Sequence, residues 1–456
     1  MSKMPNYIST TNACKLCRPL GAALAFRGIE GAVPYLHGSQ GCATYMRRYI
    51  ISHFNEPIDI ASSSLSEKHA VYGGAANLKL GLKNVTSKYH PQLIGIATTC
   101  LTETIGDDVP RILQEYAKEE GTGQTLPLNV HVSTPSYAGS HMEGFHGAVK
   151  SVVEQLATAA PTKRSINLLP GLVSSADYRY LSEIMQDFGL SSTILPDLSE
   201  TLDGPALMEY EKIPQGGTPL AAIRGMGGAR ATIEFGRTMN TNKHGSGGLS
   251  LQEHFACPNH CLGLPLGIGE TDRLFALLET LSSRTTPHKY VQERGRLVDS
   301  YVDGHKYVFG KRAIIYGDED LVVGLTAFLA EIGIKPVLCA SGGKSGLLSE
   351  AVAAVTKGIL GADEMPRVLE GMDFFDIAAE AEQLGPDLLV GHSKGAPLAR
   401  KLNIPLIRVG FPIHDRIGGQ RLLHLGYRGA QMLFDTVTNS LIEKKQNDSP
   451  IGYSYM

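Results

Sequence analysis

Short apolar runs that alternate with amphipathic helical segments are the feature that most constrains this fold. The pattern is clearest near the C-terminus, where the run Arg312–Tyr316 precedes a helical segment, Glu319–Ile332, and a second run, Pro336–Ala340. Largely apolar runs of this length are typical of strands that are buried on both faces. Strands that alternate with helices are usually joined in parallel. The pattern therefore predicts an α/β protein with doubly wound parallel sheets.

Similar alternation occurs three times along the 456 residues, a length that exceeds what one hydrophobic core usually holds. We therefore expect three Rossmann-like α/β domains, at residues 1–165, 166–310 and 311–456. The first domain includes an N-terminal arm and the predicted cluster site, and the third ends in a C-terminal helix at Gly426–Ile442. The stretch Thr134–Gly147 is rich in Gly, Ser and His, and we expect it to be a long loop.

Three of the seven cysteines lie where they could meet. Cys42 follows the apolar run Gly31–Leu36, and Cys100 follows the run Leu93–Ala97. Cys17 lies on the N-terminal arm. Ligands of open α/β sheets bind just past the carboxyl ends of the strands, so these three thiols are placed to converge there. Iron–sulfur sites usually take four cysteines, which means that a partner chain would complete a site built on three.

Composition argues against several other classes of protein. The net charge of −3 gives no sign of a nucleic-acid surface. No apolar run is long enough to span a membrane, and the N-terminus lacks the apolar core of a signal peptide. We therefore expect a cytoplasmic protein with neither a nucleic-acid nor a membrane partner. In a reducing compartment the cysteines are expected to be metal ligands or buried thiols rather than disulfides.

Three motifs around the cysteines resemble the component 1 family of nitrogenases, on its β-type side. They are Cys-Arg-Pro-Leu-Gly-Ala at 17–22, His-Gly-Ser-Gln-Gly-Cys at 37–42 and Thr-Thr-Cys-Leu-Thr-Glu-Thr-Ile-Gly-Asp-Asp at 98–108. The similarity extends over nearly the whole chain. In that family the three cysteines hold half of an interfacial iron–sulfur cluster of the P-cluster type (8Fe–7S), and the α-type subunit holds the other half. The resemblance therefore implies that the metal ligands are Cys17, Cys42 and Cys100.

The resemblance also implies partners and a reaction class. The chain would be an oxidoreductase subunit in a heterotetramer of two α-type and two β-type subunits. An ATP-hydrolysing iron protein would deliver electrons, which the cluster relays to a larger iron–sulfur metallocluster on the α-type partner. The sequence Ser-Gly-Gly-Lys-Ser-Gly at 341–346 departs from the Gly-x-x-x-x-Gly-Lys-Ser spacing of a phosphate loop. ATP is therefore expected to be hydrolysed on another protein.

Three glycines near the cysteines are candidates for contact with the cluster. They are Gly21, Gly38 and Gly41. Glycine lets backbone amides approach sulfur atoms, and such hydrogen bonds tune a reduction potential. The alternative explanation is the geometry of tight turns, which is compatible with the same role.

Two kinds of β-type chain fit the sequence. Residues 194–204 and 409–416 look most like the NifN-type scaffold, on which the iron–molybdenum cofactor is assembled. Many scaffolds of that type lack one or two of the three cysteines, whereas this chain has all three. Full ligation favours a nitrogenase-like reductase β subunit, whose complex reduces dinitrogen or a methylthio-alkane-like molecule. The scaffold is the alternative.

A second group of metal-binding residue types occurs outside these motifs. Its members are His254, Cys257, His260 and Cys261. Zinc uses such ligands, and a zinc-stabilised structural subunit would be a third, non-redox class of function. The group lacks a second half at the usual spacing, so we prefer a loop that lines a cofactor cavity. Cys14 stands in a Cys-x-x-Cys relation to Cys17, and we interpret it either as a spare thiol or as one that lies behind the ligands without binding metal.

Overall fold

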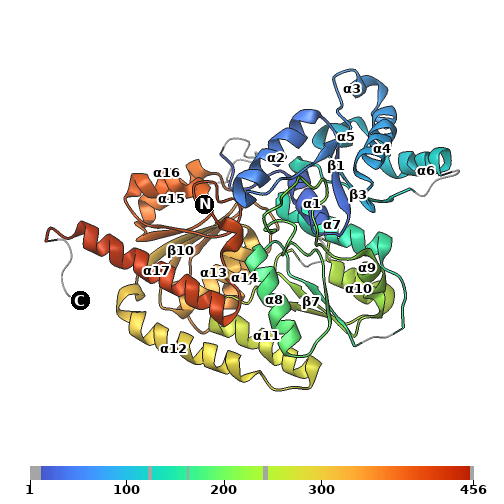
Figure 1. Cartoon of the computed structure of the whole chain (residues 1–456). Helices are drawn as coiled ribbons and strands as arrows, with labels where there is room; N and C mark the ends of the chain where they lie inside the picture. Colours follow the sequence, from blue (N-terminus) through green and yellow to red (C-terminus); the bar gives the residue numbers. More distant parts are fainter. Residues whose placement is uncertain (1–11, 122–125, 162–163, 240–244, 452–456) are drawn as a thin grey trace.

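Three parallel β-sheets carry the fold (Figure 1). The computed structural model describes residues 12–121, 126–161, 164–239 and 245–451. The strand orders are β2-β1-β3-β4 in the first sheet, β6-β5-β7-β8 in the second and β11-β10-β9-β12-β13 in the third. Every pair of neighbouring strands in these sheets is parallel. The predicted α/β architecture of parallel sheets is confirmed.

The first sheet lies between helices on both faces. Its elements are α1 (Arg18–Arg27), β1 (Ala32–His37), α2 (Gln40–Phe54), β2 (Ala61–Ser62), α3 (His69–Tyr72), α4 (Ala75–Tyr89), β3 (Leu93–Thr98), α5 (Cys100–Ile105), α6 (Val109–Glu120), β4 (Leu128–Val132), η1 (Ser136–Ala138) and α7 (His141–Leu156). Both β1 and β3 are buried along their whole length. On one face Val33 and Ile96 share an apolar cluster with Leu78 of α4 and Ile112 of α6. On the other, α1 contacts both strands.

The second and third sheets follow in the sequence. The second contains β5 (Ile166–Leu169), α8 (Ser175–Asp187), β6 (Ser192–Ile194), α9 (Leu220–Arg224), β7 (Ala231–Phe235), α10 (Gly247–Phe255) and β8 (Asn259–Leu262), after which come α11 (Gly267–Ser282) and α12 (His288–Val308). The third contains β9 (Arg312–Gly317), α13 (Glu319–Glu331), β10 (Lys335–Ser341), α14 (Leu348–Thr356), β11 (Arg367–Leu369), α15 (Phe374–Leu384), β12 (Leu388–Gly391), α16 (Ala396–Leu402) and β13 (Leu406–Arg408). The C-terminal helix α17 (Gly426–Asp448) packs along α12 (Figure 1).

One apolar core joins the three sheets. Its largest cluster of buried side chains includes Leu36 of the first sheet, Ile233 of the second and Ile315 of the third. The predicted domain boundaries at residues 165 and 310 stay a prediction. Within the part of the chain that the structure describes, no helix is long and apolar enough to cross a membrane.

The expectation of a loop through Thr134–Gly147 is wrong in its second half. Helix α7 begins at His141, and Ser140 caps it: the Ser140 side chain accepts from the backbone N–H of Met142, while the carboxylate of Glu143 accepts from the N–H of Ser140 at 2.8 Å. This reciprocal arrangement is a capping box, a Ser-x-x-Glu signal that the glycine content of the stretch obscured.

The glycines within α7 have a packing role. A side chain at Gly144 would overlap the backbone carbonyl oxygen of Arg18 in α1. On the facing helix, a side chain at Gly21 would overlap the carbonyl oxygen of His141. The two backbones therefore touch, and α1 is buried from Pro19 to its end. This contact fixes the start of α1 relative to the first sheet.

Replacing Gly21 by Ala should destabilise the protein. The added methyl group has to displace the backbone of α7, and overpacking of this kind costs about 1–3 kcal/mol of unfolding free energy. The matched control is Gly295→Ala in the interior of α12, where an added Cβ meets no atom within 4 Å. Since alanine is the better helix former, that change should stabilise by about 0.5–1 kcal/mol. Urea unfolding followed by circular dichroism measures both, and equal midpoints would contradict the tight contact.

A buried histidine connects α2 to the third sheet. His53 is 4% exposed, and its Nδ1 accepts a hydrogen bond of 2.9 Å from the backbone N–H of Ile413, which follows β13. Its ring lies edge-on against Phe411, with 4.9 Å between the ring centroids. Burial lowers the pKa of His53 to about 3. The neutral ring is thus part of the contact between the first and third sheets.

Acidification should weaken the fold through His53. In the unfolded chain His53 binds a proton below its ordinary pKa of about 6.5, whereas in the folded protein it stays neutral down to about pH 3. Between these two values the free energy of unfolding therefore falls by about 1.4 kcal/mol for each pH unit of acidification. His53→Gln removes this contribution, and its destabilisation relative to the wild type should shrink between pH 6 and pH 4. Urea unfolding midpoints of the wild type and of His53→Gln, measured from pH 6 to pH 4, test this prediction. The exposed His288→Gln is the control and should keep the wild-type slope.

Candidate metal centre

Two of the three predicted ligands follow neighbouring strands. The last residues of β1 and β3, His37 and Thr98, lie opposite each other in the parallel pair. Cys100 is the first residue of α5, directly beyond β3, and Cys42 lies in the first turn of α2, beyond β1. The structure therefore brings both cysteines to the carboxyl edge of the first sheet, where open α/β sheets bind their ligands.

Cys17 reaches the same edge from the N-terminal arm. It is the residue immediately before α1. The backbone N–H of Leu16 donates to Nδ1 of His141 at 3.3 Å, and the N–H of His141 donates back to the Leu16 carbonyl at 3.1 Å. The N–H of Arg18 donates to Oγ of Ser136 at 3.3 Å. All three cysteines thus stand at N-terminal ends of helices, where the helix dipole favours a thiolate.

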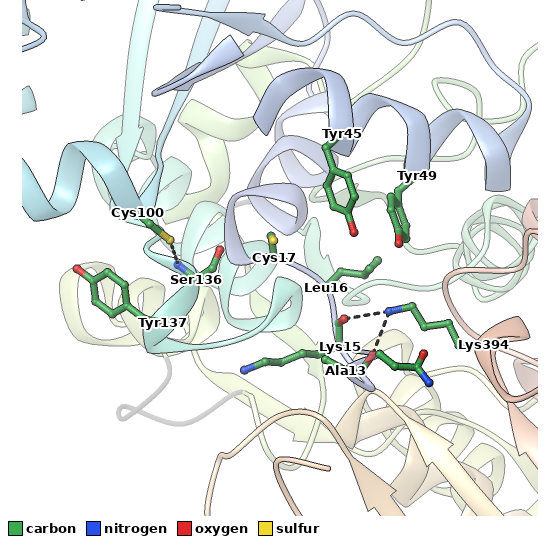
Figure 2. A pocket seen from close by; sticks show the side chains of 11 residues that line it. Ala13, Lys15, Leu16, Cys17, Tyr45, Tyr49, Cys100, Ser136, Tyr137 and Lys394 are labelled. Atoms are coloured by element: carbon green, nitrogen blue, oxygen red, sulfur yellow. Dashed lines mark hydrogen bonds between the residues drawn. The ribbon is translucent and has the colours of Figure 1, made fainter. Parts of the chain in front are cut away.

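Ser136 links Cys100 to Cys17, and no sequence motif singled it out. Its backbone N–H donates to Sγ of Cys100 at 3.2 Å. Its hydroxyl faces Cys17 and lowers the pKa of that thiol. Figure 2 shows Ser136 between the two cysteines. A positional signal was available, because Ser136 follows β4, the strand next to β3, much as Cys100 follows β3 itself.

The three thiols lie close enough to affect one another. Burial is the main cause that raises the pKa of Cys17, and the neighbouring Cys100 and Cys42 raise it further. The Ser136 hydroxyl and the Lys15 ammonium oppose this shift. Three thiolates at this edge would therefore repel one another, and bound cationic metal would relieve the repulsion.

An open cavity of about 660 Å³ lies beside the thiols. Cys17 and Cys100 contribute to its wall, together with Tyr45 and Tyr49 of α2 and with Lys394 from the third sheet (Figure 2). Cys100 is exposed, whereas the other two predicted ligands are partly buried. The thiol-lined side of the sheet is thus accessible from outside the chain.

A buried histidine fastens the two strand-end segments together. The ring nitrogens of His37 lie 3.0 Å from Oδ2 of Asp107, beyond α5, and 2.9 Å from Oγ of Ser63. Ser63 Oγ also accepts from the backbone N–H of Gly38 at 2.8 Å. The carbonyl of His37 accepts from the N–H of Thr99, which precedes Cys100, at 3.1 Å. His37 therefore sets the position of the Cys42 segment relative to the Cys100 helix.

The three candidate glycines occupy different environments. A side chain at Gly38 would overlap the side chain of Thr99, and one at Gly21 would overlap α7. At Gly41 the nearest atom would be Oγ of Ser39, 3.9 Å away. Close packing thus accounts for Gly21 and Gly38, while the space around Gly41 is open. A role for the three in tuning a cluster stays a prediction.

The zinc alternative gains no support from side-chain positions. Cys257 is buried, with Sγ 3.4 Å from Oγ1 of Thr232, whereas Cys261 is exposed on β8 and lies 3.4 Å from Nδ2 of Asn259. Among the residues that the structure describes, no three His, Cys, Asp or Glu side chains lie close enough together to hold a single metal ion.

The loop at 341–346 carries a carboxylate where a phosphate loop would carry phosphate. The carboxylate of Glu370 accepts from the backbone N–H of Gly346 at 3.0 Å and from that of Leu348 at 3.2 Å. Neighbouring backbone amides that point at one anion in this way form an anion-binding nest. Because the chain fills the nest with its own side chain, the resemblance of this loop to a nucleotide site is superficial.

Comparisons with known proteins identify the family of this chain. The sequence model of the family described as nitrogenase component 1 type oxidoreductase matches residues 17–442. The chain is 34% identical over 440 residues to the nitrogenase molybdenum-iron protein beta chain of Clostridium pasteurianum, across 96% of this chain and 94% of that one. It is 35% identical to the nitrogenase vanadium-iron protein beta chain of Trichormus variabilis, across 93% and 92%. The solved structure "Nitrogenase Cp1 at pH 6.5" superposes with a TM-score of 0.93 at 32% identity, across 100% and 98%.

These matches define the class of protein, an oxidoreductase of three parallel α/β sheets. The chain belongs to the nitrogenase component 1 family, and its relatives place it on the β-type side of that family. The resemblance found in the three cysteine motifs is thereby confirmed.

Gly38 and Gly41 provide a matched pair of variants. Gly38→Ala should lower the unfolding free energy by about 1–3 kcal/mol, because the methyl group overlaps Thr99. Gly41→Ala, three residues away, should leave the stability of the metal-free chain within about 0.5 kcal/mol of the wild type. Urea unfolding after iron chelation measures both. Equal destabilisation by the two substitutions would contradict this account.

Proposed function

We propose that this chain is the β-type subunit of a nitrogenase-like reductase complex. In this proposal Cys17, Cys42 and Cys100 hold half of a P-cluster-type (8Fe–7S) iron–sulfur cluster, and an α-type subunit holds the other half. The observation that carries the proposal is the arrival of three cysteines at one sheet edge, each at the N-terminal end of a helix. Family membership adds independent support.

The donor set suits a cluster better than a single ion. The thiols influence one another electrostatically, yet they are not gathered around one metal-ion position in the described residues. A cluster of several irons is anchored through separate metal atoms and so tolerates thiols that stand apart. Three cysteines are also too few for a complete site, and the exposure of Cys100 leaves room for ligands from a partner.

The chain's own residues would bind and tune this group. The cluster, when bound, supplies reversible one-electron chemistry. The N–H of Ser136, which donates to Sγ of Cys100, would stabilise added negative charge and raise the reduction potential. The helix N-termini would act in the same direction. The apolar body of α1 excludes water from the inner side of Cys17.

Electrons would come from an ATP-hydrolysing iron protein and pass to a larger metallocluster on the α-type partner. The assembly would be a heterotetramer of two α-type and two β-type chains. The self-filled nest at Glu370 supports the assignment of ATP hydrolysis to another protein. Two relatives are named as molybdenum-iron and vanadium-iron nitrogenase beta chains, which favours dinitrogen as substrate over a methylthio-alkane-like molecule.

Cysteine variants of the co-purified complex test the proposal. Replacing Cys17, Cys42 or Cys100 by Ala should each lower the iron content and abolish the low-temperature paramagnetic signals of the cluster, because a methyl group offers no donor to iron. Cys14→Ala and Cys339→Ala are matched controls and should retain the iron, since both thiols are buried away from solvent. Iron analysis and electron paramagnetic resonance give the readout.

Two outcomes would argue against a reductase. Iron loss on substitution of Cys257 and Cys261, with iron retained in the Cys42 and Cys100 variants, would overturn the site. A wild-type complex with far fewer irons than an 8Fe–7S cluster requires, and with no reductase activity beside an iron protein, would favour the NifN-type assembly scaffold instead.

A further inference from the structure

The N-terminal arm, defined here as residues 12–17, runs along the carboxyl edge of the third sheet. Ala13 pairs with Asp373 in an isolated antiparallel bridge. The backbone N–H of Cys14 donates to the carbonyl of Met372 at 3.2 Å, and the N–H of Phe374 donates to the carbonyl of Asn12 at 3.1 Å. The arm is therefore hydrogen-bonded to the segment between β11 and α15, more than 350 residues away in the sequence.

The arm occupies the place where a sheet of this topology binds ligands. The strand order reverses between β9 and β12, which makes their carboxyl ends the switch point of the sheet. Sγ of Cys14 lies 3.6 Å from Nε2 of His392, the residue after β12. A side chain at Gly342, the residue after β10, would overlap the backbone of Cys14. The crevice is thus filled by the chain itself.

Lys394, which lies just beyond strand β12 of the third sheet, donates hydrogen bonds to the arm. Its Nζ lies 3.0 Å from the carbonyl oxygen of Ala13 and 3.3 Å from that of Lys15 (Figure 2). The ammonium also lies over the ring of Tyr49, 6.0 Å from its centroid. A charged donor shared by two backbone carbonyls forms stronger hydrogen bonds than a neutral one. The second of these carbonyls belongs to the residue two positions before Cys17.

We propose that Lys394 is a positioning residue for Cys17. It fastens the arm into the switch-point crevice of the third sheet, and Gly342 permits the close approach that this requires. The first and third sheets together thereby fix the thiol: His141 holds Leu16 from one side, and Lys394 holds Ala13 and Lys15 from the other. That this arrangement matters for iron binding rests on the function proposed above. That Lys394 holds the arm in the crevice does not depend on that function.

Two different substitutions test whether Lys394 and Gly342 hold the arm in the crevice. Both are made in the full chain, which is purified with its partner where one co-purifies. Lys394→Met removes the two charged hydrogen bonds and keeps the length of the side chain. Gly342→Ala pushes the arm outward without any change of charge. Lys394→Arg restores a cation with several donors. The control is Lys401→Met on α16, the helix that begins two residues after Lys394; its side chain is 64% exposed and paired with Glu382.

Hydrogen–deuterium exchange is the primary readout. Both Lys394→Met and Gly342→Ala should speed exchange at the amides of Cys14 and Leu16 about tenfold or more. The first change removes hydrogen bonds from a charged group, and the second displaces the backbone of the arm from the crevice. Exchange in β1 and β3 should stay unchanged. Lys394→Arg should recover most of the protection, and Lys401→Met should match the wild type. Arm amides that exchange at the wild-type rate in both variants would overturn the proposal.

Iron content separates this inference from the proposed function. If the complex holds a cluster, the two variants should lose iron while the control keeps it, and the loss should follow the exchange rate of the arm. Full iron retention in a variant whose arm exchanges rapidly would overturn the positioning role. A wild-type complex without iron would refute the proposed function, but the exchange measurements would still decide whether Lys394 holds the arm.

Discussion

The backbone contact between α1 and α7 is the constraint on which the candidate site depends. Gly21 and Gly144 let the two helices touch, with the carbonyls of His141 and Arg18 in the space that side chains would take. Because Cys17 directly precedes α1, the position of its thiol follows from the packing of helices. Ser136 lies just before α7, so the same contact also sets the distance between its hydroxyl and the arm.

Electrostatics at the thiol edge follow from that placement. Burial of α1 draws Cys17 partly out of water and raises its pKa, and the neighbouring thiols raise it further. The Ser136 hydroxyl and the Lys15 ammonium act on the pKa of Cys17 in the opposite direction. A site with these opposing influences is costly to ionise when empty. Metal binding, as proposed above, would resolve this conflict, since the metal would take the place of the protons.

Local sequence patterns were sufficient to predict much of the fold and part of the site. Alternating apolar runs located the strands, and the rule that ligands bind at strand ends brought Cys42 and Cys100 together. The patterns failed where the cause is distant in the sequence. The local capping box of Ser140 and Glu143 marks the start of α7, but the reason for Gly144 inside the helix is its contact with Arg18, far away in the sequence. The role of Lys394 depends on Ala13, 381 residues away, and no local motif encodes that contact.

The first and third sheets use their carboxyl edges in different ways. At the third sheet the arm fills the switch-point crevice, and Glu370 fills the backbone nest beside it. These internal ligands close the edge where a nucleotide would bind in other doubly wound folds. At the first sheet the edge keeps an open cavity with an exposed thiol. The N-terminal arm thus fills the binding crevice of the third sheet, and the end of the same arm places the Cys17 thiol at the edge of the first sheet. If the three cysteines are ligands, as proposed above, the incomplete set at the open edge would favour association with a partner, since that partner would cover the thiols and supply the donors that this chain lacks.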